Sequence, residues 1–553
     1  MRTRRGRRYV VVGDAGVVTL DRQRVLEDRL DSDPRIASVS VVAHESPNQE
    51  FLRATSPSGC TVLLAVDFAA LVGSLSEEPT TEDVKAWARS ASERGLWHDW
   101  WLSDARDIQE SPTILPTAEL DSQESQDRAS SHFLALSNVP LNGNAISITV
   151  DATWLGPHQT GAQVLTTAAI EALAHHPHVD SIHLVGLQEL PTYAEHLTDL
   201  STVRVGEPHS AADVLWYPNQ IDQRVDISRA SRLGRRVVTT YLDLIAYDIP
   251  RYHTSADAWA AYRSLQRRIA LSVDGITTIS ADVAKHLLEE VPLLDPSRVR
   301  PIPLGLDHIS VENLEPADDI KDLRNELGSR PFLLVLGNDF QHKNRDFAVR
   351  VWEEVLARST NCDLVLAGLH VKSSSSRDLE EELVSQHTNL RGRVFSVGHV
   401  RSSSRSWLMS HAAAVLYPSS AEGFGFVPYE AAALGTPSTF TSFGPLREIA
   451  RVPDVPRSWS IEAYADDVRG LLEDPEKARE RVSALRSAIS TYTWQRFAEQ
   501  LVDFLVAIDT LPPAPGSLVG GGTADAAALA SILNSRTWRA TAALRRLGGK
   551  ARR

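Results

Sequence analysis

Short runs of consecutive apolar residues alternate with longer helical segments from about residue 145 to residue 510. A strand that is apolar along its whole length is buried on both faces, which is typical of a parallel sheet with helices on either side. The most regular runs are Phe332–Leu336, Leu364–Ala367, Val394–Val397, Ala414–Tyr417 and Ser438–Thr441. A helix among them carries an apolar stripe of Phe347, Val351, Trp352 and Val355. The pattern predicts an α/β fold with a doubly wound parallel sheet.

A second series of apolar runs precedes this one. It comprises Ser147–Val150, Ser181–Val185, Val214–Tyr217, Val237–Thr240 and Ile276–Ile279. Two series in tandem predict two doubly wound domains. We place them at residues 145–316 and 317–511, the second with a crossing helix at its end. Ligands of such sheets bind at the carboxyl ends of the strands.

The segments outside these domains differ in character. Residues 1–110 have the signals of a small α/β module, and residues 111–144 are polar without an apolar period, as expected of a linker. Residues 512–553 begin with a Pro- and Gly-rich linker and continue as a basic tail. Within the first module the expected elements are strands at Tyr9–Val12, Ala37–Val42 and Thr61–Val66 and a polar helix through Val25–Leu30.

Composition narrows the function classes. Apolar residues make up 42% and charged residues 23% of the 553 residues, as in ordinary globular proteins. Two cysteines exclude a disulfide scaffold or a cysteine-based zinc module, and a net charge of −14 argues against a nucleic-acid partner. No apolar stretch reaches the roughly 18 residues of a membrane span. We expect a cytoplasmic protein.

The two ends of the chain are basic. Five arginines precede residue 9, and seven basic residues stand against one aspartate after residue 522. A basic, partly amphipathic tail could lie on the anionic inner face of a membrane, or it could be a solvated tail.

The sharpest local signal is the segment Glu422–Glu430, which follows an apolar run and leads into a helix. Its two glycines let the backbone approach a ligand closely, and a helix N-terminus favours an anion. Two carboxylates so placed can bind two sets of hydroxyls, as a nucleotide sugar presents. The alternative is a glycine-containing turn with one solvated and one capping glutamate. The segment's candidate residues are Glu422, Gly423, Phe424, Gly425, Phe426 and Glu430.

This segment resembles the donor-site motif of glycosyltransferase family 4, in which seven residues separate two glutamates. Other motifs of that family agree in order and spacing over most of residues 145–510. In the second half they are Gly337, His342–Asn344, Val397–Val400, Leu416–Ser419, Gly435–Pro437 and Arg447–Ile449. In the first half they are Ile148–Asp151, Gly156–Gly161, Val237–Thr239, Asp274–Ser280 and Gly305–Asp307.

The resemblance implies a GT-B fold, with two Rossmann-like domains facing a cleft. It also implies a hexosyltransferase-type enzyme that moves a sugar, with retention of configuration, from a nucleotide-diphospho-sugar to a glycan or lipid-linked acceptor. Such transfer serves polysaccharide or cell-envelope biosynthesis. The family needs no metal, so no metal site and no cofactor are expected besides the donor substrate.

Carried onto this chain, the resemblance assigns the site residue by residue. Glu422 would hold the donor sugar, Glu430 the ribose hydroxyls and Lys343 the diphosphate. A lone lysine at a helix start is otherwise usually solvated. Lys343, Glu422 and Asp243 are the catalytic candidates. The remaining candidates are Gly337 and Asn338 in the donor site, Gly398, His399 and Val400 around the base, and Thr160 and Gly161 in an acceptor or phosphate loop.

Two positions depart from the family. Asn338 stands where an arginine often partners the lysine, so phosphate binding could rely on Lys343, on backbone amides or on an arginine such as Arg345. Leu242 and Asp243 stand where many relatives have a His-Asp pair, so the histidine is lost. Asp243 either contacts the acceptor, substitutes in part for the histidine, or only caps the following segment. The loss of the histidine at Leu242, together with a degraded first module, motivates one alternative, a non-catalytic glycan-binding or scaffold subunit of a transferase assembly. A further alternative is a GT-B sugar-nucleotide epimerase.

Residues 9–108 more weakly resemble the second half of a family 2 (GT-A) glycosyltransferase. Asp14–Gly16 stands at the metal-binding motif of that family, and Thr81–Asp83 resembles the start of its general-base helix. Gly16 replaces the final aspartate, which removes a metal ligand. We interpret the module as a non-catalytic remnant that serves acceptor binding or assembly, or as an unrelated small α/β domain.

Overall fold

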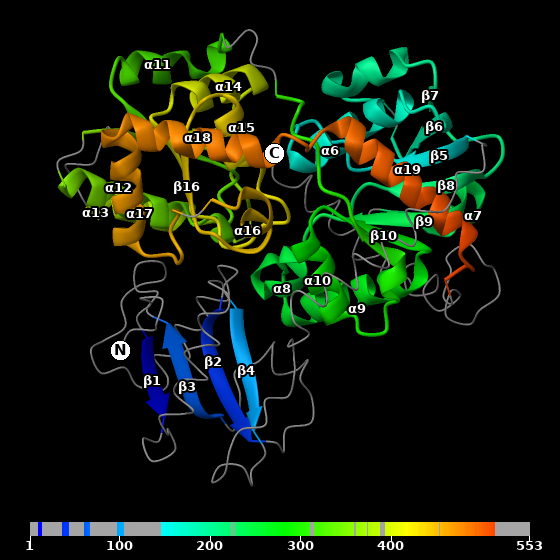
Figure 1. Ribbon diagram of the computed structural model, residues 1–553, viewed down its shortest axis with the longest axis horizontal. Helices are drawn as coiled ribbons and strands as arrows, with labels where there is room; N and C mark the ends of the chain where they lie inside the picture. Colours follow the sequence, from blue (N-terminus) through cyan, green and yellow to red (C-terminus); the bar gives the residue numbers. More distant parts are fainter. Residues whose placement is uncertain are drawn as a thin grey trace. The chain divides into compact units, whose positions relative to one another are not determined.

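A computed structural model describes residues 145–514, with gaps at 188, 223–224, 226, 310–314, 359–360, 373, 387–392 and 453, and the backbone of four strands near the N-terminus. The helix expected at residues 25–30, the motifs at 14–16 and 81–83, the linker at 111–144 and both basic ends lie outside the described residues. From residue 145 the chain divides into two compact units (Figure 1). The first unit contains residues 145–247, 257–308 and 491–514. The second contains residues 248–256 and 309–490.

The four N-terminal strands form a mixed sheet of order β1-β3-β2-β4. β3 pairs antiparallel with β1 and β2, and β4 pairs parallel with β2. The three predicted strands are confirmed, and the fourth was not predicted. Their bounds are β1 Tyr9–Gly13, β2 Ile36–Ala43, β3 Cys60–Val66 and β4 Trp97–Ser103. The resemblance of this module to a GT-A half stays a prediction.

The sheet of the first unit has seven strands, all parallel, in the order β11-β10-β9-β8-β5-β6-β7. Because the chain winds outward in one direction from β5 and in the other from β8, the switch point lies between these two strands. Every apolar run predicted here is a strand. The bounds are β5 Ile146–Asp151, β6 Val179–Val185, β7 Val203–Val205, β8 Ala212–Tyr217, β9 Gly234–Tyr241, β10 Gly275–Thr278 and β11 Val299–Pro301.

Helices and short 3-10 turns connect these strands. The helices are α6 Gly161–Ala174, α7 Ala230–Leu233, α8 Ile245–Asp248, α9 Ala256–Ser272, α10 Ala281–Glu290 and α19 Trp494–Thr510, and the turns are η2 Thr192–Asp199, η3 Ile227–Arg229 and η5 Pro296–Arg298. The crossing helix α19 packs on α6, β8 and β9 of this unit (Figure 1). It buries one apolar face that includes Phe497, Leu501, Phe504, Leu505 and Ile508.

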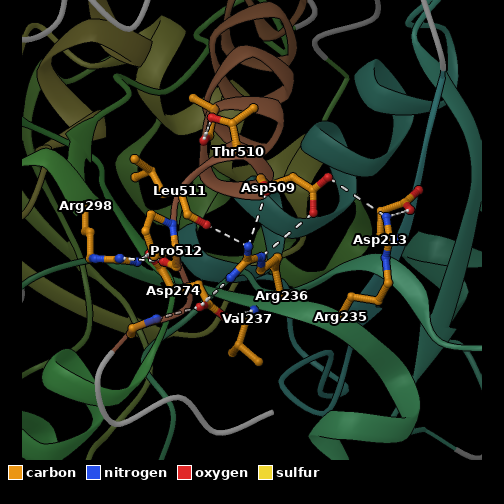
Figure 2. A network of polar contacts seen from close by, with 12 residues as sticks. Asp213, Arg235, Arg236, Val237, Asp274, Arg298, Asp509, Thr510, Leu511 and Pro512 are labelled. Carbon is orange, nitrogen blue, oxygen red and sulfur yellow. Dashed lines mark hydrogen bonds and ion pairs between the residues drawn. The ribbon is translucent and has the colours of Figure 1, made fainter. Parts of the chain in front are cut away.

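Beyond α19 the chain is held at the amino ends of the strands (Figure 2). Asp274, which directly precedes β10 and is fully buried, accepts hydrogen bonds from the amides of Val237 (2.9 Å) and Ala514 (3.0 Å). Arg298, which directly precedes β11, donates to the carbonyl of Pro512 (2.6 Å). The first residues of the expected C-terminal linker therefore dock on the first unit.

The sheet of the second unit has five parallel strands in the order β14-β13-β12-β15-β16, with its switch point between β12 and β15. The strands are β12 Phe332–Leu336, β13 Asp363–Ala367, β14 Val394–Gly398, β15 Ala414–Tyr417 and β16 Ser438–Phe440. All five were predicted to within one residue at each end.

Helices of the second unit cover this sheet. They are α11 Lys321–Leu327, α12 Arg345–Ala357, α13 Arg377–Gln386, α14 Ser402–His411, α15 Phe426–Ala433, α16 Gly444–Ala450, α17 Ile461–Glu473 and α18 Pro475–Ile489, with 3-10 turns η4 Pro250–Tyr252, η6 Asp318–Ile320 and η7 Gln341–Lys343. The four residues of the predicted apolar stripe on α12 are all fully buried. α12 packs beside α17 (Figure 1).

Candidate functional site

The loops that leave β12, β13 and β14 begin side by side at the carboxyl edge of the second sheet. The amide of Gly337 donates to the carbonyl of Ala367 (3.0 Å), and the amide of Gly368 donates to the carbonyl of Gly398 (2.7 Å). Gly368 has φ +155°, and a Cβ there would lie 1.9 Å from the oxygen of Gly337. Only glycine therefore allows the two backbones to approach so closely. The predicted residues Gly337 and Gly398 lie at this edge.

The loop after β12 is bonded to the loop after β15 across the switch point. Asn344 is the N-cap residue of α12 and lies in the left-handed region (φ +50°). Its side-chain amide donates to the carbonyl of Pro418 (2.9 Å). The amide of Ser420 donates to the carbonyl of His342 (2.8 Å). Lys343 therefore lies between His342 and Asn344, both of which are hydrogen-bonded to the loop after β15. His342 is held through its backbone carbonyl and Asn344 through its side-chain amide.

Lys343 and Glu422 meet at this point. The ammonium of Lys343 contacts Oε1 of Glu422 at 2.5 Å, and the side chains are 20% and 9% exposed. The hydroxyl of Tyr417, at the end of β15, donates to the same oxygen. Burial and the neighbouring Glu422 raise the pKa of Tyr417 well above its usual value, so the phenol is a proton donor at neutral pH. Two of the three predicted catalytic residues, Lys343 and Glu422, are thus paired in this structure.

Glycine is required where the Glu422 loop enters α15. Gly425 has φ +83°, and a Cβ there would lie 2.8 Å from Cδ2 of Leu446. Beside it the buried Phe424 packs against Phe426, with ring centroids 5.2 Å apart. Phe424 is therefore part of the packing beneath the loop, and Gly423 and Gly425 form its backbone.

Glu430 lies on the buried face of α15 and pairs with Arg405 of α14. The side chain of Glu430 is 3% exposed, whereas that of Arg405 is 36% exposed. Arg405 was not predicted, and no local pattern in the sequence marks it. The carboxylate assigned to ribose thus carries a cationic partner that is partly open to solvent.

The two positions discussed for phosphate binding are engaged elsewhere. The guanidinium of Arg345 is buried and pairs with Glu380 at 3.0 Å. Asn338 accepts a hydrogen bond from the amide of Leu369 (3.1 Å), which ties the loop after β12 to the loop after β13. Of the three sources considered, Lys343 and backbone amides are the ones that this geometry favours.

The predicted base-framing residues follow β14, the edge strand of the sheet. Gly398 is left-handed (φ +65°) and ends β14. His399 is exposed, and the half-buried Val400 packs against the core of the unit. Arg401 alone separates these three residues from α14, the helix that carries Arg405.

In the first unit, the predicted loop lies at the N-terminus of α6. Thr160 caps the helix, and its amide donates to Oε1 of Gln163 (3.0 Å). Thr160 and Gly161 are both exposed. Asp151, at the end of the neighbouring strand β5, is buried, and this burial raises its pKa. An exposed helix N-terminus suits an anionic group.

The Leu242–Asp243 loop is held by one side chain that was not predicted. Gln220 accepts a hydrogen bond from the amide of Leu242 (3.2 Å) and donates to the carbonyl of Asp243 (2.6 Å). Oδ1 of Asp243 accepts from the amide of Ile245 (2.9 Å), the first residue of α8. Capping, one of the roles considered for Asp243, is therefore present in the structure.

Within the parts of the chain that the structure describes, no group of three or more His, Cys, Asp or Glu residues is placed to hold a metal ion. In that same portion no helix combines the length and the apolar character needed to cross a lipid bilayer.

Comparison with known proteins relates the second unit to a family. Residues 318–487 match the family described as "Glycosyl transferases group 1". The matched segment contains Lys343, Glu422 and Glu430.

Two relatives extend this match. The chain is 30% identical over 177 residues to an uncharacterized glycosyltransferase of Methanocaldococcus jannaschii, and 25% identical over 255 residues to an alpha-maltose-1-phosphate synthase of Mycolicibacterium smegmatis. These alignments cover 31% and 43% of this chain and 43% and 64% of the relatives, less than two thirds of either relative.

The fold is shared more widely. An alpha,alpha-trehalose-phosphate synthase from Burkholderia xenovorans superposes with a TM-score of 0.50 at 12% identity, over 66% of this chain and 100% of that one. The two doubly wound units of this chain therefore have the GT-B fold.

Proposed function

We propose that this chain is a retaining glycosyltransferase that moves a sugar from a nucleotide-diphospho-sugar to a glycan or lipid-linked acceptor in polysaccharide or cell-envelope biosynthesis. The observation that carries the proposal is the contact of Lys343 with Glu422 at the switch point of the second unit, within the segment that matches group 1 glycosyl transferases. This is where open parallel sheets bind their ligands.

The chemistry requires a charge to be stabilised as it develops. The bond between the anomeric carbon and the diphosphate breaks, and the same carbon bonds to an acceptor oxygen on the same face. The proton of the acceptor hydroxyl is released with the nucleoside diphosphate. A fixed ammonium beside the leaving diphosphate stabilises its growing negative charge. Lys343 supplies that ammonium, and Glu422 holds it in place before the donor arrives and then binds the sugar hydroxyls.

We assign recognition of the nucleoside to Glu430 and to the residues that follow β14. Glu430 binds the ribose hydroxyls, and Arg405 shares its carboxylate. The backbone of Gly398, His399 and Val400 frames the base. In the first unit, the exposed start of α6 at Thr160 and Gly161 binds an anionic or hydroxyl-rich part of the acceptor. The transfer needs no metal ion, so no resident cofactor is proposed.

The first experiment identifies the donor. Purified full-length protein is screened by thermal shift against nucleoside diphosphates and their sugars, and the stabilising nucleotide sugars are then assayed for transfer. We expect Lys343→Ala to lower kcat/KM at least about 100-fold, because one preorganised donor to a developing anion contributes that much. Lys477→Ala is the matched control, since Lys477 also pairs with a carboxylate of this unit, Asp467 at 3.1 Å. Equal activity of the Lys343 variant and wild type would contradict the assignment.

The metal question has a separate test. We expect EDTA to leave turnover unchanged. Loss of turnover in EDTA that manganese restores would contradict the metal-independent mechanism.

The scaffold alternative is favoured by one observation, the capping role of Asp243 in a loop that lacks the histidine of many relatives. Its signature is nucleotide binding without turnover on any acceptor. Interconversion of the sugar nucleotide without an acceptor would instead indicate an epimerase.

A further inference from the structure

Three aromatic rings of the second unit, those of Tyr252, Phe340 and His342, cluster at the turn that carries Lys343. Tyr252 comes from the short segment 248–256, which belongs to this unit although it lies between two elements of the first. Its ring centroid lies 5.2 Å from that of Phe340 and 5.8 Å from that of His342, and the last two rings stack at 5.6 Å. The Tyr252 hydroxyl contacts Nδ1 of His342. A residue 90 positions earlier in the chain thus contacts the neighbour of the lysine.

The segment that carries Tyr252 is itself fixed. The hydroxyl of Ser374 donates to the carbonyl of Arg251 (2.8 Å), and the carbonyl of Ser374 accepts from the amide of Gln341 (2.7 Å). Ser374 therefore joins the turn before Tyr252 to the turn that carries Lys343. The two turns are tied through Ser374, by one side-chain and one backbone hydrogen bond, as well as by the rings.

The backbone of His342 has a further role. Its carbonyl accepts from the amide of Ser420 (2.8 Å) and from the hydroxyls of Ser419 (3.3 Å) and Ser420 (3.2 Å). These serines open the loop that leads to Glu422. The imidazole of His342 is thus held on one side by Tyr252, and its carbonyl holds the Glu422 loop on the other.

We propose that Tyr252 and His342 form a positioning pair that sets the place of Lys343 for the diphosphate of the donor. The pair acts through Lys343 and does not touch substrate. This inference rests on the proposed function for its ligand. It adds Tyr252, which lies outside the family's motif set, and gives a role to His342, the first residue of one of those motifs.

The protonation of His342 agrees with this role. Burial, and in second place the adjacent Lys343, hold the pKa of His342 well below its usual value. The imidazole is therefore neutral near pH 7, so that one ring nitrogen accepts and the other donates. A neutral ring adds no positive charge next to Lys343 that would compete for the phosphates.

The test separates the contribution of the diphosphate to binding from the contribution of the rest of the nucleotide. Binding of UDP, GDP and ADP and of the matching monophosphates to the full chain is measured by calorimetry for wild type and Tyr252→Phe. The quantity compared is the ratio of diphosphate affinity to monophosphate affinity. We expect this ratio to be about 5- to 10-fold smaller in the variant than in wild type, as for one lost hydrogen bond. Monophosphate affinity should stay within about twofold, because the nucleoside pocket is unchanged.

Tyr464→Phe is the matched control. It removes a buried hydroxyl of the same unit, which bonds to Thr441 at 2.7 Å, and should leave the diphosphate advantage unchanged. If Tyr252→Phe does not fold, His342→Phe provides the same comparison. If both single variants fold, their double variant should lose no more than either one, because both remove the same contact.

A second readout needs no nucleotide. Competitive acetylation, read by peptide mass spectrometry, compares Lys343 with Lys477 within one molecule. We expect the relative rate at Lys343 to rise about threefold in Tyr252→Phe, because the lysine is released from its fixed position. An unchanged rate would contradict the inference, as would an equal loss of diphosphate and monophosphate affinity. If wild type binds no nucleotide, the proposed function fails, and the acetylation rate still decides whether the pair positions Lys343.

Discussion

At the scale of single residues, one oxygen of Glu422 accepts hydrogen bonds from Lys343 and from the hydroxyl of Tyr417. Two donors on one carboxylate oxygen restrict the rotation of the carboxylate. Tyr417 immediately ends β15, so its hydroxyl is as well fixed as the strand itself. The position of Glu422 is therefore set by the sheet as well as by its own flexible loop.

We expect Tyr417→Phe to weaken binding of the nucleotide sugar about 5- to 10-fold more than binding of the nucleoside diphosphate alone, since only the sugar is assigned to Glu422. Calorimetry with both ligands measures the difference. Tyr241→Phe is the control, because it removes a buried hydroxyl that bonds to Gln266 at 3.0 Å in the other unit. A loss of equal size for both ligands would show that Tyr417 does not act through Glu422.

The depressed pKa of His342 has a consequence for stability. The folded state resists protonation of this ring whereas the unfolded state does not, so the unfolded state binds more protons below about pH 6.5. Stability is therefore lost as the pH falls. We expect the decrease in Tm between pH 8 and pH 5.5 to be smaller in His342→Asn than in wild type, as measured by calorimetry. Parallel curves for the two proteins would show that His342 titrates normally.

At the scale of elements, the edge of the second sheet depends on glycine. We expect Gly368→Ala to cost more than about 3 kcal/mol of stability, because a Cβ would lie 1.9 Å from the Gly337 oxygen at an unfavourable φ. Gly156→Ala is the control, since a Cβ there has no atom within 4 Å. Thermal unfolding of both variants measures the difference. Equal Tm values would mean that the strands can separate at this edge without cost.

β12 and β15, which were predicted, differ physically from the strands that were missed. β12 and β15 are continuous apolar runs buried on both faces, so the sequence marks their ends. β7 and β11 have three residues each, and β4 contains histidine and aspartate, so none shows such a run. A short strand is stabilised by its neighbour in the sheet more than by its own composition.

The site was predictable where its residues belong to local motifs. Lys343, Glu422 and Gly425 each lie beside a strand end or a helix start, and the structure gives each a matching place. Arg405 and Gln220 were not predictable, because their partners lie 25 and 22 positions away and no periodicity encodes such contacts. The contact of Tyr252 with His342 was not predictable either, although His342 belongs to a local motif, because 90 positions separate the two residues.

At the scale of the whole molecule, α19 returns the chain to the first unit and ends in the network around Asp274 (Figure 2). Arg236 belongs to this network, donating to the carbonyls of Leu511 (2.6 Å) and Asp509 (3.2 Å). The chain of the first unit is thus closed by residues that lie more than 200 positions after its sheet begins. Its stability depends on that closure.

We expect Asp274→Ala to lower the stability of the first unit by about 3 kcal/mol, because it leaves buried donors without an acceptor. Asp509→Ala removes the same charge from the same network at a site that is 44% exposed, and should cost less than about 1 kcal/mol. Thermal unfolding and hydrogen exchange along α19 measure both. Similar losses in the two variants would contradict the ranking.

The docking of Pro512 and Ala514 also sets how the molecule bears a mechanical load. These residues are held beside the starts of β10 and β11, whereas the loops that carry Thr160 and Asp243 leave the opposite edge of the sheet. β9 has eight residues, so the two edges are separated by roughly 26 Å. A pull on the chain at Ala514 would be taken up by Asp274 and Arg298 and transmitted into the strands from their amino ends. A tether at that end would therefore act on the strand ends opposite to the loops of Thr160 and Asp243.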